Sequence, residues 1–124
     1  MILQRVLPAV SLAGLALNAC SKKPADEQVM CTMEARSALA VVVVDSVTGA
    51  GLAATTVALA RDGTFSDTLS GRDSVVSGVF ERAGTYRVEL RSPGYRAWAR
   101  DGITVGRDEC HVQTVRLRAL LVPQ

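Results

Sequence analysis

The chain has 124 residues, of which 48% are hydrophobic, 4% aromatic and 21% charged, and its formal net charge is +2. This length allows a single domain, and the apolar fraction excludes a disordered chain. Acidic residues are spread among the arginines, so the small net charge provides no electrostatic surface for nucleic acid, and we expect no nucleic-acid partner.

Residues 1–19 predict an export signal. A single cation, Arg5, precedes an almost wholly apolar run over residues 6–17, and no acidic residue occurs before position 20. A short positive segment followed by about a dozen apolar residues is typical of a secretory signal peptide. The run is shorter than the roughly 20 apolar residues that a membrane-spanning helix needs.

The apolar run ends in a motif that resembles the bacterial lipobox, Leu17-Asn18-Ala19-Cys20. The resemblance implies cleavage before Cys20 and attachment of palmitate-type acyl chains to this cysteine. Asn18 departs from the residue usual at its position, and an ordinary secreted protein is the alternative. Several acyl chains would anchor the chain stably, since each buried CH₂ contributes about 0.8 kcal/mol. The implied location is the membrane of the cell envelope, and the outer membrane where the organism has one.

Residues 20–28 are polar and include Lys22, Lys23 and Pro24, a composition that cannot bury a core and predicts a flexible tether. The folded domain is therefore expected over residues 29–124.

The first half of this domain predicts short strands separated by turns. Residues 38–44 are rich in valine and apolar on both faces, as in a buried strand. Residues 55–61 alternate, Asp62-Gly63 indicates a hairpin turn, and residues 65–69 form the next expected strand, which should break at Ser70-Gly71. Residues 75–80 follow as another strand.

The second half continues this pattern. Residues 85–91 alternate most regularly, with Tyr86, Val88 and Leu90 on one face. Shorter segments over residues 96–100 and 103–105 precede a last alternating segment over residues 111–120. Seven or eight short strands with turns at this spacing predict an all-β sandwich or barrel.

A family resemblance rests on the order of several short motifs, namely Val42-Val43-Val44-Asp45, Thr48-Gly49, residues 54–59, Gly84-Thr85-Tyr86-Arg87-Val88 and Pro93-Gly94-Tyr95. In this order they resemble the carboxypeptidase regulatory-like domain over residues 38–120. The resemblance implies a Greek-key β-sandwich of the transthyretin (prealbumin) type. It also implies an extracytoplasmic binding or envelope-structural role, usually without catalysis.

The two remaining cysteines, Cys31 and Cys110, precede the first and last expected strands. Export would place them in an oxidising compartment, so we expect a disulfide, with free thiols as the alternative. Bridged cysteines need Cα atoms within about 7 Å. The first and last strands should then begin at the same end of the fold and run parallel where they are neighbours.

Catalytic and metal-binding motifs are sparse. His111 is the single histidine, and we expect it to be a surface residue at the start of a strand; a small hydrolase that uses His111 is the alternative function. Turn acids are scattered without the spacing of a calcium loop or a zinc site, so we expect no metal or cofactor.

Aromatic and basic residues indicate one candidate binding patch, which consists of Tyr95, Trp98, Arg96 and Arg100. An exposed tryptophan and tyrosine could bind a carbohydrate or an envelope protein. The alternative is that both rings pack over the end of the core.

Overall fold

The computed structural model describes residues 29–124, which form an all-β domain with one short 3-10 turn over Ala53–Thr55. The expected signal peptide, Cys20 and the tether lie outside the described residues. The expectation of an all-β domain is confirmed, and the strands are β1 (Ser37–Asp45), β2 (Val57–Asp62), β3 (Phe65–Arg72), β4 (Val75–Phe80), β5 (Gly84–Arg91), β6 (Trp98–Val105) and β7 (Val115–Leu121). Within the described part of the chain, no helix is long and apolar enough to span a membrane.

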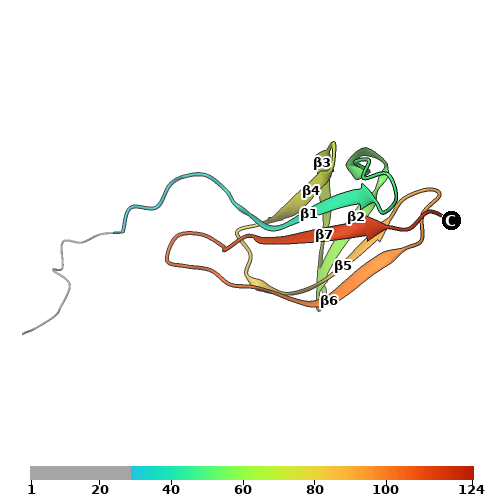
Figure 1. The fold of residues 1–124 in the computed structure, drawn as a ribbon. Helices are drawn as coiled ribbons and strands as arrows, with labels where there is room; N and C mark the ends of the chain where they lie inside the picture. The colour runs from blue at the N-terminus through green and yellow to red at the C-terminus, as the bar shows by residue number, and fades with distance from the viewer. Residues whose placement is uncertain (1–28) are drawn as a thin grey trace, which may run out of the picture.

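The seven strands form one mixed sheet in the order β6-β5-β2-β3-β4-β1-β7, which curls into a nearly closed barrel (Figure 1). All neighbours are antiparallel except β1 and β7, which run parallel, with Leu39 opposite Val115. The parallel pairing of the terminal strands confirms the sequence-based expectation. At the far end of the barrel, the Gln124 N–H donates to the Gly94 carbonyl at 2.9 Å, so the chain after β7 meets the loop before β6.

The strand patterns follow from the position of each strand in the sheet. β1 lies between β4 and β7 and is buried along nearly its whole length, with Leu39, Val41 and Val43 in the core. β5 keeps the expected alternation, because Tyr86, Val88 and Leu90 face the core while Arg87 and Glu89 face outward.

Tyr86 is the largest side chain that is fully buried. Its hydroxyl donates to the Arg82 carbonyl at 2.6 Å, so the polar end of the ring has a partner. The Arg82 guanidinium lies 3.9 Å from the centroid of the Phe65 ring and donates to Asp62 Oδ2 at 3.0 Å. This cluster closes the end of the barrel where β2 meets β3.

Two expected strand boundaries at glycines are wrong. β3 continues through Gly71, where a Cβ atom would lie 1.8 Å from the Val75 carbonyl oxygen. Glycine is therefore required there for the close approach of β3 and β4, and it does not mark a turn. The two short segments expected over residues 96–105 form one strand, β6, because Gly102 adopts a φ of 68° and is accommodated beside an irregularity in the pairing with β5.

Candidate functional site

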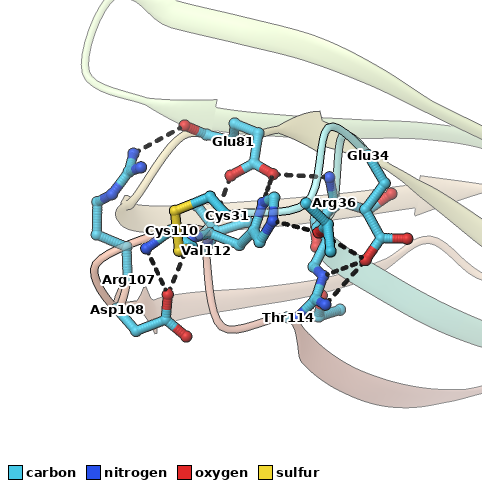
Figure 2. Close-up of polar contacts among 12 residues, drawn as sticks. Cys31, Glu34, Arg36, Glu81, Arg107, Asp108, Cys110, Val112 and Thr114 are labelled. Carbon is cyan, nitrogen blue, oxygen red and sulfur yellow. Dashed lines mark hydrogen bonds and ion pairs between the residues drawn. A yellow bond between two sulfur atoms is a disulfide. The ribbon is translucent and has the colours of Figure 1, made fainter. Parts of the chain in front are cut away.

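The disulfide between Cys31 and Cys110 joins the segment before β1 to the loop before β7 (Figure 2). The two Cα atoms are 5.2 Å apart, within the range that a disulfide requires. The expected pairing is confirmed, and β1 and β7 begin at this same end of the barrel (Figure 1). The disulfide therefore fixes the point at which the N-terminal part of the chain enters the domain.

A carboxylate beside the disulfide connects three separate segments. Glu81 follows β4, and its Oε1 accepts from the Arg36 backbone N–H at 2.9 Å and from His111 Nδ1 at 2.5 Å (Figure 2). Its Oε2 accepts from the Val112 N–H at 3.1 Å. These bonds, the one from the Arg36 N–H first and the one from the His111 ring next, lower the pKa of Glu81 to about 2. Glu81 is therefore ionised at neutral pH.

His111 is buried, with 7% of its surface exposed, so the expectation of a surface residue at a strand start is wrong. Its ring lies between Glu81 and Thr32, whose Oγ1 is 2.9 Å from Nε2. A carboxylate only accepts hydrogen bonds, so Nδ1 carries a proton, and Nε2 faces the Thr32 hydroxyl, which also lies 3.5 Å from Glu34 Oε1. Hydroxyl, imidazole and carboxylate thus follow the order found in enzymes with a hydroxyl nucleophile.

The loop before β7 is held by Asp108. Its Oδ1 accepts from the backbone N–H groups of His111 and Cys110, at 2.9 and 2.8 Å, and these bonds hold the pKa of Asp108 below its usual value. Because these residues are held in a turn, β7 begins only at Val115, later than the sequence predicts. A hollow of about 430 Å³ lies beside this loop and is lined by Val29, Met30, Cys31, Thr32, Arg36, Asp108, Glu109, Cys110 and His111.

Tyr95, from the candidate patch, connects the loop before β6 to the end of β1. Its hydroxyl donates to Asp45 Oδ2 at 2.6 Å, and this bond lowers the pKa of Asp45 and raises that of Tyr95. Asp45 Oδ1 also accepts from the backbone N–H groups of Val47 and Thr48, which forms the turn expected after β1. The Tyr95 hydroxyl is therefore used within the domain.

Trp98 begins β6, opposite Leu90, and is half-buried against the core. The Arg100 guanidinium lies 5.3 Å from its ring centroid, a cation–π arrangement, and Arg96 is exposed. The structure thus brings Trp98 and Arg100 together and leaves one part of the tryptophan open to solvent.

Within residues 29–124, no three His, Cys, Asp or Glu side chains are grouped so that they could hold a metal ion. Sequence reasoning missed the roles of Glu81 and Thr32, which lie 30 and 79 residues from His111, because no local motif marks them. Glu81 resembles an ordinary turn residue in the sequence, and no sequence signal connects it to His111.

A scan against models of protein families finds no match, and no curated protein matches the sequence.

Proposed function

We propose that the chain is a lipid-anchored protein of the cell envelope, whose domain over residues 29–124 has a non-catalytic binding or structural role. The disulfide carries this proposal, because disulfides persist in oxidising compartments outside the cytoplasm. The chain has three cysteines, so the Cys31–Cys110 pair leaves only Cys20, which follows the lipobox-like motif.

We also propose that the domain is a Greek-key sandwich of the transthyretin type and belongs to the carboxypeptidase regulatory-like family. The antiparallel order β5-β2-β3-β4, in which β5 returns beside β2, supports this assignment. The bond from the Tyr86 hydroxyl to the Arg82 backbone is similar to the tyrosine corner of such sandwiches. The turn made by Asp45, Thr48 and Gly49 agrees with the motif on which the resemblance rests.

The test of the anchor is metabolic labelling with a fatty acid in cells that express the full chain. Cys20→Ala should abolish the label and leave an unprocessed or soluble product. Cys31→Ala is the matched control, because it removes a cysteine of the disulfide and should retain the label. Equal label in the wild type and in the Cys20→Ala variant would contradict the proposal.

The binding contact that we propose is the surface around Trp98, with Tyr95, Arg96 and Arg100 beside it, and its partner is an envelope protein or a carbohydrate. The half-exposed ring and the stacked Arg100 guanidinium support it. A photo-crosslinking residue in place of Arg96 should capture the partner in cells, because Arg96 is exposed and is needed for no contact in the core. Capture that is unchanged by Trp98→Ala in a folded variant would contradict this contact.

A small hydrolase that uses His111 is the second candidate, favoured by the alignment of Thr32, His111 and Glu81. Its test is hydrolysis of an activated model ester by the purified protein. A rate that Thr32→Val and His111→Gln both abolish would support the hydrolase. A rate that neither variant changes supports the non-catalytic role, in which these groups hold the N-terminal segment in place.

A further inference from the structure

The outer side of strands β3, β4, β1 and β7 carries rows of side chains that the strand register defines. In one row Arg72 lies opposite Val75, Val75 opposite Val42, and Val42 opposite Arg118. The next row consists of Ser70, Ser77, Ala40 and Arg116. Directly paired residues share a face of a sheet, so Arg72, Arg116 and Arg118 lie at the ends of these rows, beside smaller side chains. We call this surface the basic face.

The positive charge of the basic face is not neutralised within the domain. Arg72, Arg116 and Arg118 are exposed, and among residues 29–124 no carboxylate lies within ion-pair distance of them. Glu34 borders the face, but its Oε1 is bound by Arg36 at 2.8 Å. Positive charge at this surface is therefore available to an anionic partner.

The outer side of β2, β5 and β6 carries carboxylates beside its arginines. There Arg87 is paired with Glu89 at 3.0 Å and with Asp101 at 2.6 Å, although Arg61 and Arg91 are exposed without an ion-pair partner among the described residues. The two rows of the basic face contain no carboxylate, and this distinguishes the two surfaces.

An apolar side chain accompanies the arginines. Leu120, which is paired with Val44 and lies two residues after Arg118, is 48% exposed. A hollow of about 480 Å³ lies on this face, and its lining includes Glu34, Arg36, Ala40, Val75, Ser77 and Arg116. Because Glu34 and Arg36 precede β1, the segment that enters the domain from the tether borders this same face.

We propose that the basic face lies against the anionic phospholipid headgroups of the membrane that holds the anchor, an inference that rests on the proposed function. Residues 20–28 can extend over no more than about 30 Å, so an anchor at Cys20 would keep the domain close to the membrane. An anionic surface attracts each nearby arginine within a Debye length of about 8 Å and raises membrane partition by about fivefold per residue. Exposed Leu120 suits the boundary between headgroups and acyl chains.

The experiment compares two fluorophore positions on the same strand, β3. Ser70 lies in a row of the basic face, whereas Ser66 is opposite Arg61 in the other part of the sheet, and both are exposed. The full chain, purified from the envelope and labelled at Ser70→Cys or Ser66→Cys with a polarity-sensitive dye, is reconstituted with vesicles of phosphatidylcholine. Vesicles that also contain phosphatidylglycerol provide the anionic surface.

The Ser70 dye should report a less polar surrounding only with phosphatidylglycerol, and the Ser66 dye should not respond. Combined Arg72→Gln, Arg116→Gln and Arg118→Gln should lower the ratio of membrane-contacting to free domain on the order of a hundredfold, from about fivefold for each arginine, and so remove most of the Ser70 response. High salt should abolish the Ser70 dye response of the chain that keeps all three arginines. This comparison does not depend on whether the triple variant folds. Equal responses at the two positions, or a Ser70 response without anionic lipid, would overturn the inference.

Failure of the anchor is detected separately. The mass of the purified chain shows whether Cys20 carries lipid, and a chain without lipid can be added to the same vesicles from solution. A Ser70 response in that case supports the basic face while it contradicts the proposed anchor. A lipidated chain with no Ser70 response contradicts the basic face and leaves the anchor intact.

Discussion

Replacing both Cys31 and Cys110 with serine should destabilise the domain strongly and leave its strands in place. The cysteines are 79 residues apart in the sequence, and constraining a loop of that length in the unfolded chain corresponds to about 4.5 kcal/mol. Losses of native disulfides from small domains are typically about 2–5 kcal/mol. For a domain of this size, such a loss lowers the melting temperature on the order of 10–30 °C.

The strands should persist because β1 and β7 stay paired from Leu39 opposite Val115 to Asp45 opposite Leu121 without the disulfide. Thermal unfolding followed by far-UV circular dichroism measures both quantities. Reduction of the wild-type protein should reproduce the effect of the double variant, and Cys20→Ser should leave the melting temperature unchanged. A melting temperature that is insensitive to reduction would refute this reasoning, and so would loss of the β-sheet signal at room temperature.

Three further predictions concern acid stability, packing and the candidate patch. The folded-state pKa of Glu81 is about 2, below its ordinary 4.5. The stability that this carboxylate contributes is therefore complete above pH 4.5 and is lost as the pH falls toward 2. Glu81→Gln should flatten this part of the pH dependence of the free energy of unfolding, measured in urea. Gly71→Ala places a methyl group 1.8 Å from the Val75 carbonyl oxygen, a backbone atom, and should cost about 3 kcal/mol. Gly106→Ala meets no atom closer than 3.5 Å and should be nearly neutral in the same assay. Trp98→Ala should cost about 2 kcal/mol in denaturant unfolding, less than a fully buried ring; a loss of 3–5 kcal/mol would identify Trp98 as a core residue only.

Local patterns predicted the elements whose causes are local. The alternation over residues 85–91 was sufficient for β5, and Asp62-Gly63 was sufficient for the hairpin between β2 and β3, where Gly63 has a φ of 58°. The break expected at Gly71 was wrong because glycine occurs in proteins for two different reasons. It allows a positive φ in a turn, and it allows two backbones to approach closely. Only the second applies at Gly71, and it depends on the position of Val75 in the neighbouring strand.

The contacts of the candidate site could not be predicted in the same way. The bond between Glu81 and His111 depends on where β4 ends and where the loop before β7 crosses it, and neither is encoded near either residue. The bond between Tyr95 and Asp45 likewise joins residues 50 positions apart. The disulfide was predictable because the expected export and the number of cysteines restrict the pairing without any knowledge of the register.

Mass spectrometry of the protein purified without reduction from the cell envelope tests the central proposal most directly. We expect an N-terminal peptide that begins at Cys20 and carries the mass of attached acyl chains, together with a peptide pair joined through Cys31 and Cys110. A chain that still begins at Met1, with an unmodified Cys20 and with Cys31 and Cys110 open to alkylation, would contradict both the anchor and the oxidising compartment.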